Sequence, residues 1–570
     1  MTFISENSKP RCTPLLVMLL LTASLALAPG SLRAKNGSNV DTLSSANVEK
    51  GMTGYGKTVF QGQKIDTFSV EVLGVLENSM PGQDMILVEA QHPVLESTQV
   101  MSGMSGSPIY INGQLIGALA YSWGFAKEPI AGVTPIENIF NANRGSSSSS
   151  GPGQGERLRS LLAVSGFQGR YREAIEEKFS EMGFPVQTTA TGSGSTEDIV
   201  EQESKPGFDP GDAIGIQLME GDLSMTAIGT VTHVQDDEIY AFGHPFLNAG
   251  NIELPMATAE VHTPMPSVQT SFKLASPVRE AGSIQEDRQA AIVGETGETP
   301  DMLPVTLNLE TSTGSFQEQY EVNVIRNRYI TPQLVSSAAS NFASNKINQL
   351  GLNRVESRVE LKLRDDEDIV LRSSSMVSGG FDPWAFLPLS NLWMNPFKEL
   401  DVESVRVDMT MKPEIEAARI KDVWIGENTF NPGQKTTVYV QLNPYRGQPV
   451  TRSVQLELPA NIRGKRARLH AVPGSALTQL QARPDSFEQM VTYVNATRLD
   501  SELGIVLQIP ELSLNVSGHR LKKLPYSISG AFQRSSRTRS NFRAGDLLET
   551  LPTDWVLEDS QSLTLPIRNK

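Results

Sequence analysis

The feature that most constrains this chain is its many short apolar runs, which are broken by glycine and proline. Apolar and polar residues alternate around Phe68, Val70 and Val72, and again around Val438, Val440 and Leu442. A period of two is typical of half-buried strands, and the 46 glycines and 34 prolines mark turns between them. With 39% hydrophobic and 20% charged residues the 570-residue chain can bury ordinary cores, which argues against a coiled coil, a collagen-like fibre or a disordered chain. The sequence predicts a mainly β protein of several domains.

The N-terminus has the order of a secretory signal peptide. Lys9 and Arg11 precede an apolar stretch from Leu15 to Ala28, and small residues follow. The stretch is shorter than the roughly 20 residues that a membrane-spanning helix needs, so an uncleaved anchor is the alternative. We expect residues 1–34 to be removed, the mature chain to have no stable membrane span, and the protein to be exported to the periplasm or the cell exterior.

Several chemistries are excluded by what the sequence lacks. Cys12 is the only cysteine and lies in the predicted signal peptide, so disulfides, a cysteine nucleophile and cysteine-ligated zinc are not expected. The histidines are too far apart for a zinc-binding helix, and we find no phosphate-binding loop or dinucleotide fingerprint. We therefore predict no metal and no cofactor. The formal net charge of −15 argues against nucleic-acid binding.

The most specific string is Gly103 to Pro108, Gly-Met-Ser-Gly-Ser-Pro, with Asn112-Gly113 as a hairpin signal shortly after it. A serine between glycines at a tight turn exposes its hydroxyl. Neighbouring backbone N–H groups, here those of Gly103 and Ser105, can converge on a developing oxyanion. Alone the string is weak evidence, because glycines commonly serve backbone geometry.

A serine nucleophile needs a base, and the sequence holds six histidines. His244 follows the strand-like run Ile239 to Phe242 and a glycine, where a side chain projects from a rigid scaffold. The alternative is a structural histidine. His92 is the next candidate base.

These strings resemble a known family. Ser122-Trp123-Gly124 and Gly132-Val133 follow Ser105 in the order of chymotrypsin-like serine peptidases. With Gly103 to Pro108 and Ala241 to His244, the sequence resembles the SpoIVB (stage IV sporulation protein B) peptidase family. The resemblance implies a chymotrypsin-like double β-barrel, Ser105 as nucleophile, His244 as base, and Ser122, Trp123 and Gly124 as the edge that binds an extended peptide.

The sequence departs from that family in two ways. The serine segment precedes the histidine segment, which implies a permuted barrel order. No aspartate stands in the stretch before the serine where the family has its acid. Asp84, Glu89 and Glu253 are weak substitutes, and loss of the acid would leave a slow dyad or an inactive protein.

The sequence thus predicts an exported serine endopeptidase that cleaves protein or peptide substrates, with the Ser105 hydroxyl within hydrogen-bond reach of the His244 ring. The alternative is an inactive peptidase-like barrel that binds peptides or proteins in the cell envelope. The predicted organisation is a signal peptide (1–34), a serine-bearing barrel half (35–143), a Ser/Gly-rich linker (144–157), a helical connector (158–210), a histidine-bearing barrel half (211–375), an aromatic and proline-rich strap (376–400), a β-sandwich (401–525), and a basic tail with a C-terminal strand segment (526–570).

Overall fold

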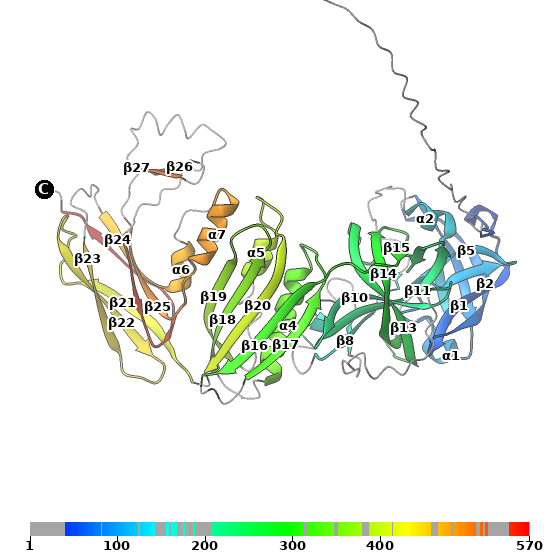
Figure 1. Ribbon diagram of the computed structural model, residues 1–570, viewed down its shortest axis with the longest axis horizontal. Coiled ribbons are helices and arrows are strands. Elements are labelled where there is room, and N and C mark those ends of the chain that lie inside the picture. The colour runs from blue at the N-terminus through cyan, green and yellow to red at the C-terminus, as the bar shows by residue number, and fades with distance from the viewer. Residues whose placement is uncertain are drawn as a thin grey trace, which may run out of the picture. The chain divides into compact units, whose positions relative to one another are not determined.

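The fold is taken from a computed structural model of the chain (Figure 1). It describes residues 40–80, 82–123, 126–142, 156–158, 161–167, 173, 175–177, 179, 186–188, 207–268, 270–312, 314, 317–346, 352–378, 387–412, 414–457, 466–479, 484–508, 513–516, 519–522 and 547–568. The predicted signal peptide, most of the linker and the arginine-rich part of the tail lie outside these residues. Among the described residues, no helix is long and apolar enough to cross a membrane.

The N-terminal part forms a closed antiparallel barrel of six strands. Each strand pairs with two others in the order β4-β1-β2-β3-β6-β5, and β5 pairs back to β4 to close the ring. The strands are β1 (Thr53–Gln61), β2 (Lys64–Met80), β3 (Gln83–Gln91), β4 (Pro108–Ile111), β5 (Gln114–Ser122) and β6 (Ile130–Pro135). Short helices flank them, at η1 (Ser45–Asn47), α1 (Leu95–Thr98) and α2 (Ile136–Phe140).

Local sequence explains the strands of this barrel. Phe68, Val70 and Val72 alternate along β2 and are buried in the barrel core, as the period of two predicts. Asn112 and Gly113 have φ of 51° and 82° and join β4 to β5, with Ile111 paired to Gln114. Both residues tolerate this left-handed conformation, so the predicted hairpin is confirmed.

A second closed barrel of six antiparallel strands follows in the chain. Its order is β10-β13-β14-β15-β12-β11, and β10 pairs with β11 to close it. The strands are β10 (Ala213–Gly221), β11 (Ser224–Gln235), β12 (Glu238–Ala241), β13 (Gly250–Met265), β14 (Phe272–Asp287) and β15 (Ile292–Thr296). Each barrel is built from one continuous stretch, so the serine-bearing barrel precedes the histidine-bearing barrel as a complete unit.

Apolar side chains from both barrels pack together. One cluster contains Leu115 and Ala118 of β5 and Ile139 of α2. These side chains pack with Tyr240 and Val293 of the second barrel. A second cluster joins Val59 of β1 to buried residues of β10, β11, β13 and β14. Backbone hydrogen bonds add to these contacts. The Gly62 N–H donates to the Val261 carbonyl at 2.7 Å, and the Val261 N–H donates to the Gly62 carbonyl at 2.9 Å. The interface therefore combines two apolar clusters with directional backbone hydrogen bonds.

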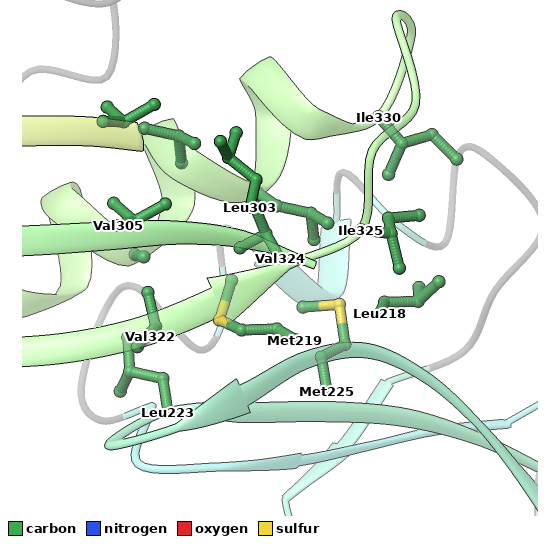
Figure 2. Packing of buried hydrophobic residues seen from close by; sticks show 14 of the residues in the cluster. Leu218, Met219, Leu223, Met225, Leu303, Val305, Val322, Val324, Ile325 and Ile330 are labelled. Carbon is green, nitrogen blue, oxygen red and sulfur yellow. The ribbon is translucent and has the colours of Figure 1, made fainter. Parts of the chain in front are cut away.

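The sheet of the second barrel continues into a further sheet through β10. One edge of β10 pairs with β11 from Ala213 to Met219. On its other edge, Ile214 to Ile216 pair with β13 of the barrel, whereas Met219 to Gly221 pair with β17 (Gln317–Val324). Beyond it lie β16 (Leu303–Thr311), β20 (Val402–Lys412), β18 (Leu352–Leu363) and β19 (Ile369–Ser378). Apolar side chains of both strands, including Met219 and Val324, pack where β10 leaves the barrel (Figure 2). Helices α4 (Thr331–Lys346) and α5 (Leu387–Trp393) contribute to the same core.

Two segments differ from the sequence prediction. Residues 161–165, predicted to begin a helix, form strand β8 (Leu161–Ser165), which pairs with β11. Its consecutive apolar residues fit a strand buried on both faces as well as a helix, and the open edge of β11 decides between them. The described residues 175–177 are helical. Short strands β7 (Glu156–Arg157) and β9 (Val186–Thr188) lie on either side of β8 in the chain.

The second difference concerns β20. This strand falls within the predicted β-sandwich (401–525), but it pairs with β16 and β18. Its buried residues Val405, Val407, Met409 and Met411 join the core of that sheet. Alternation identifies a strand but not its partner, so the sequence could not assign β20 to a sheet.

The β-sandwich packs two four-stranded sheets around one core. Its strands include C-terminal residues beyond the predicted 401–525. One sheet contains β23 (Val450–Glu457), β22 (Lys435–Pro444), β21 (Ala417–Ile425) and β29 (Val556–Glu558), and the other β28 (Leu547–Pro552), β25 (Glu502–Gln508), β24 (Arg466–Pro473) and β30 (Gln561–Pro566). The remaining elements are α6 (Gly474–Gln479), α7 (Phe487–Asn495) and the hairpin of β26 (Ser513–Val516) and β27 (His519–Lys522).

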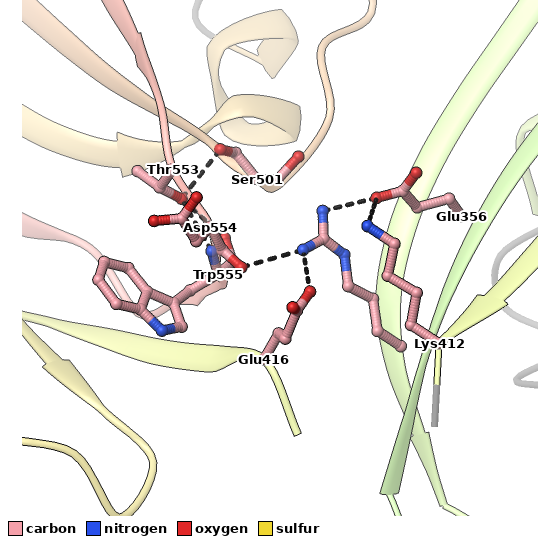
Figure 3. Close-up of polar contacts among 8 residues, drawn as sticks. Glu356, Lys412, Glu416, Ser501, Thr553, Asp554 and Trp555 are labelled. Atoms are coloured by element: carbon pink, nitrogen blue, oxygen red, sulfur yellow. Dashed lines mark hydrogen bonds and ion pairs between the residues drawn. The ribbon is translucent and has the colours of Figure 1, made fainter. Parts of the chain in front are cut away.

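A buried arginine, Arg354, links β18 to the sandwich, and Figure 3 labels its partners Glu356, Glu416 and Asp554. Arg354 donates to Glu416 and Glu356, both at 2.6 Å, and to the carbonyl of Asp554 at 3.0 Å. Its side chain is only 6% exposed, so two carboxylates compensate the cost of removing the guanidinium from water.

Candidate active site

Ser105 lies in a tight turn that precedes β4, here called the serine turn (residues 102–107). Gly103 and Gly106 have φ of +93° and +95°, which favours glycine at both positions. Ser107 closes the turn, since its N–H and its hydroxyl both donate to the Met104 carbonyl, at 3.0 and 2.7 Å. The glycines that flank Ser105 are thus required by backbone geometry, as the alternative interpretation of the string anticipated.

Gly106 has a second reason to be glycine, because the other barrel approaches it closely. A Cβ at this position would lie 1.9 Å from the carbonyl oxygen of Thr230 and 2.6 Å from the amide nitrogen of Phe242. Both residues belong to the histidine-bearing barrel or the loop after its strand β12. No side chain fits there without separating the two barrels.

Thr230 of β11 holds the serine turn at two points. Its N–H donates to the Ser105 carbonyl at 2.8 Å, and its hydroxyl donates to the Gly103 carbonyl at 2.8 Å. Thr230 is fully buried, so these bonds are made away from water. Buried hydrogen bonds of this kind fix the Gly103–Met104 and Ser105–Gly106 peptide planes.

Two further donors from the second barrel complete this support. The N–H of Lys273 in β14 donates to the Ser102 carbonyl at 3.0 Å, and the Thr232 hydroxyl donates to the Gly106 carbonyl at 2.8 Å. A trans peptide points its N–H opposite its carbonyl, so the bond to Ser102 also sets the direction of the Gly103 N–H. The conformation of the serine turn therefore depends on both barrels.

His244 is held in the reciprocal way by the first barrel. It belongs to a loop after β12, here called the histidine loop (residues 242–249). The Thr134 hydroxyl of β6 donates to the Gly243 carbonyl at 2.6 Å. A Cβ on Gly243 would lie 2.9 Å from that of Ala118 in β5. Each barrel thus supports the segment that carries the other's candidate residue.

The His244 ring is buried, and its Nδ1 lies 2.8 Å from the carbonyl oxygen of Pro245. A carbonyl oxygen can only accept a hydrogen bond, so this contact places the proton on Nδ1. Nε2 then carries the lone pair, which is the tautomer that a general base needs.

Asp287, at the end of β14, organises the histidine loop and was not anticipated from the sequence. Its carboxylate accepts from the N–H groups of Phe246 at 2.7 Å, Leu247 at 2.5 Å and Ala249 at 3.2 Å. Burial raises the pKa of Asp287, and these backbone hydrogen bonds act in the opposite direction. A single acidic residue at a strand end carries no sequence signal for this role.

The proposed substitutes for the triad acid lie elsewhere. Asp84 accepts from the Asn78 N–H and the Ser45 hydroxyl in the first barrel. Glu89 of β3 is the cross-strand partner of Glu71 in β2, and Glu253 is exposed on β13. None of these described contacts reaches His244.

The Ser105 hydroxyl is fully buried and makes no hydrogen bond to a described residue. The hydrogen bond to His244 expected from the sequence is therefore not formed in this structure. Catalytic hydrogen bonds are commonly long or poorly aligned until substrate binds. His92, the alternative base, stacks on Phe60 with ring centroids 4.2 Å apart in the first barrel.

The predicted substrate edge is partly occupied by the chain itself. Ser122 in β5 pairs with Ala131 of β6 on one side and with Glu156 of β7 on the other. Trp123 is half-buried against the side chains of Met85, Ala120 and Tyr121, and Gly124 lies outside the described residues. Among the residues that the structure describes, no cluster of three or more His, Cys, Asp or Glu side chains is placed to hold a metal ion.

Two closed six-stranded barrels that hold a serine turn and a histidine loop between them define a chymotrypsin-like double-barrel protein. Residues 31–136 match the family model of SpoIVB peptidase S55, a family of serine peptidases. The match includes Ser105, ends before His244, and covers about a fifth of the chain. Comparison with curated proteins gave no match, and comparison with solved structures gave none either.

Proposed function

We propose that the protein is an exported serine endopeptidase of the SpoIVB type that cleaves protein or peptide substrates. The observation that carries the proposal is the reciprocal support of the serine turn and the histidine loop by opposite barrels. Accurate placement of two catalytic groups requires such a rigid frame. The family match over the serine-bearing barrel supports the reaction class.

In the proposed mechanism the Ser105 hydroxyl attacks the scissile carbonyl and His244 Nε2 accepts its proton. The N–H groups of Gly103 and Ser105 stabilise the oxyanion of the tetrahedral intermediate. The imidazolium then protonates the leaving amine, and water releases the acyl group by the same steps. The Pro245 carbonyl takes the orienting role that a carboxylate has in a full triad.

A carbonyl dipole stabilises the imidazolium less than a full negative charge does. We therefore expect slow turnover relative to enzymes with a complete triad, since loss of the orienting carboxylate is known to cost orders of magnitude in rate. Ser122 and Trp123 are the proposed substrate-binding residues, with Gly124 beyond the described part. Binding there requires the peptide to displace or extend the pairing with β7.

The test is covalent labelling of the purified protein with a fluorophosphonate, followed by mass spectrometry of the labelled peptide. The adduct should lie on Ser105, and Ser105→Ala should abolish it. Ser102→Ala is the matched control, because the Ser102 hydroxyl is also buried and has no hydrogen-bond partner among the described residues. Equal labelling of Ser105→Ala and the native protein would refute the peptidase proposal.

The burial of the Ser105 hydroxyl favours a second candidate function. An inactive double barrel could bind extended peptides or envelope proteins without cleaving them. In that case the probe leaves Ser105 unlabelled, and peptides bind the native protein and Ser105→Ala with equal affinity.

A further inference from the structure

Lys273 is a buried lysine for which the proposed mechanism has no use. It is the second residue of β14 and its side chain is fully buried. Among the described residues no other lysine is buried to this degree, and no carboxylate forms an ion pair with it. Burying an ammonium group without a countercharge is costly, and burial lowers the pKa of Lys273 to about 7.

The amino group of Lys273 lies between two threonine hydroxyls, one from each barrel. Nζ donates to Thr58 Oγ1 in β1 at 2.6 Å and to Thr230 Oγ1 in β11 at 3.4 Å. Thr58 and Thr230 are both fully buried, and their hydroxyl oxygens are 3.5 Å apart. The lysine thus joins the two barrels at one point.

The rest of Lys273 lies against the serine turn. Its Cβ, Cγ and Cδ atoms would each be 3.2 Å from a Cβ on Gly103. Its own N–H donates to the Ser102 carbonyl at 3.0 Å. The backbone, the aliphatic stem and, through Thr230, the amino group of Lys273 therefore all support the serine turn.

The direction of these hydrogen bonds follows from the donor inventory. A threonine hydroxyl has one hydrogen and accepts with its lone pairs. When Nζ donates to Thr230 Oγ1, the single hydrogen of that hydroxyl is directed to the Gly103 carbonyl, 2.8 Å away. Lys273, Thr230 and Gly103 form a chain of hydrogen bonds that ends two residues before Ser105.

We propose that Lys273 is a positioning residue of the candidate active site, which orients the serine turn through Thr230 and its own backbone. The inference rests on the proposed function, because it concerns the same site. A residue that merely filled this space would be better served by an apolar side chain of similar volume, which carries no desolvation cost. Methionine offers such a side chain.

The experiment compares Lys273→Met, Thr230→Val and the double variant with the native protein. Lys57→Met is the matched control, since Lys57 precedes Thr58 on β1 and its amino group lies over the Tyr110 ring instead. The first measurement is the fluorophosphonate labelling rate at increasing probe concentration. The second is hydrogen exchange of the peptide that contains residues 101–108, which needs no activity. Thermal unfolding checks that each variant is folded.

For Lys273→Met we expect labelling to slow by about ten- to a hundredfold at saturating probe, with the half-saturating concentration unchanged, because misplacement of a reacting group acts on the chemical step. Exchange in residues 101–108 should rise. The double variant should label no more slowly than Thr230→Val, since both changes break one chain of hydrogen bonds. Thr230→Ser should keep the native rate within about threefold, because the hydroxyl remains.

Three outcomes would overturn the inference. The first is a rate of hydrogen exchange at residues 101–108 of Lys273→Met that equals the native rate. The second is a native labelling rate in that variant. The third is a double variant whose labelling rate falls by the product of the factors measured for the two single variants. If Lys273→Met does not fold, the contrast between Thr230→Ser and Thr230→Val decides, and equal exchange and labelling in those two variants also overturn it. If the native protein is not labelled at Ser105 at all, the proposed function fails, while the exchange measurement still tests the role of Lys273.

Discussion

Thr230 donates its backbone N–H to the carbonyl of Ser105 across the interface between the two barrels, at 2.8 Å. The two residues are far apart in the sequence, and each belongs to a separately closed barrel. The geometry of the candidate nucleophile is therefore a property of the pair of barrels. Changes at the interface should affect the site even where they leave each barrel intact.

Gly106→Ala should lower the free energy of unfolding by more than the positive φ of Gly106 alone would cause. The added Cβ would lie 1.9 Å from the Thr230 carbonyl oxygen, and neither backbone can move freely. We expect a loss of more than about 3 kcal/mol in the free energy of unfolding, as for a severe steric conflict in a core. Denaturant unfolding measures this loss.

Gly113→Ala is the control for that prediction. Gly113 also has a positive φ, of 82°, but a Cβ there would have no atom within 4 Å. The free energy of unfolding of Gly113→Ala should fall by about 1 kcal/mol, the cost of the left-handed conformation alone. Similar losses in the two variants would contradict the close approach at Gly106.

Asp287→Ala should loosen the histidine loop. Three backbone N–H groups lose their acceptor, and each unsatisfied buried donor costs about 1–3 kcal/mol unless water replaces it. We expect destabilisation of roughly 3 kcal/mol and a fall in fluorophosphonate labelling of at least about tenfold. Asp237→Ala, in an exposed turn between β11 and β12, is the control and should be close to neutral. Unchanged labelling of folded Asp287→Ala would show that the loop does not need this carboxylate.

Lys273 should make the stability of the native protein depend on pH in a defined window. Burial lowers its pKa from 10.5 to about 7, so between these values the unfolded chain binds more protons than the folded one. Stability from this group therefore rises with pH across the window and is constant below about pH 7. Relative to Lys273→Met, the native protein should gain on the order of 4 kcal/mol between pH 7 and 10, at 1.36 kcal/mol per pKa unit. Denaturant unfolding of both proteins at several pH values measures this, and parallel curves would contradict it.

A chain cut between Gly145 and Gly155 should remain associated. The barrels share the apolar clusters around Tyr240 and Val59, and their backbones exchange hydrogen bonds at Gly62 and Val261. A protease site inserted in the linker allows the cut, and size-exclusion chromatography with native mass spectrometry reports the association. Two folded fragments that separate in native buffer would show that the barrels do not form a shared site.

The sequence predicts the local features of this fold better than its long-range contacts. Asn112-Gly113 identifies a hairpin because both residues allow positive φ, and the alternation at Phe68 to Val72 identifies a strand. Leu161 to Val164 fits both strand and helix periods, and the partner of β11 decides its structure.

The support of the candidate site was not predictable in this way. Lys273 and Thr58 meet across 215 positions, and Asp287 binds a loop about 40 residues earlier. A single lysine or aspartate in a strand pattern is read as an exposed residue, because charged side chains are rarely fully buried. Only the closure and docking of the barrels bring these groups to the serine turn and the histidine loop.

Strand β10 also has a consequence for how the molecule opens. On one edge of this strand, Ile214 to Ile216 pair with β13 of the barrel and Met219 to Gly221 pair with β17 of the adjoining sheet, while the other edge pairs with β11 as far as Met219. Displacing β10 breaks hydrogen bonds in both the barrel and the sheet. The barrel and that sheet should therefore behave as one cooperative unit of unfolding, with a shared high protection of their β10 amides. The sandwich has its own core and can lose structure separately. A mechanical force applied to the sandwich would be transmitted through Arg354 and β20 to the adjoining sheet. From there it would reach the barrel that carries the histidine loop.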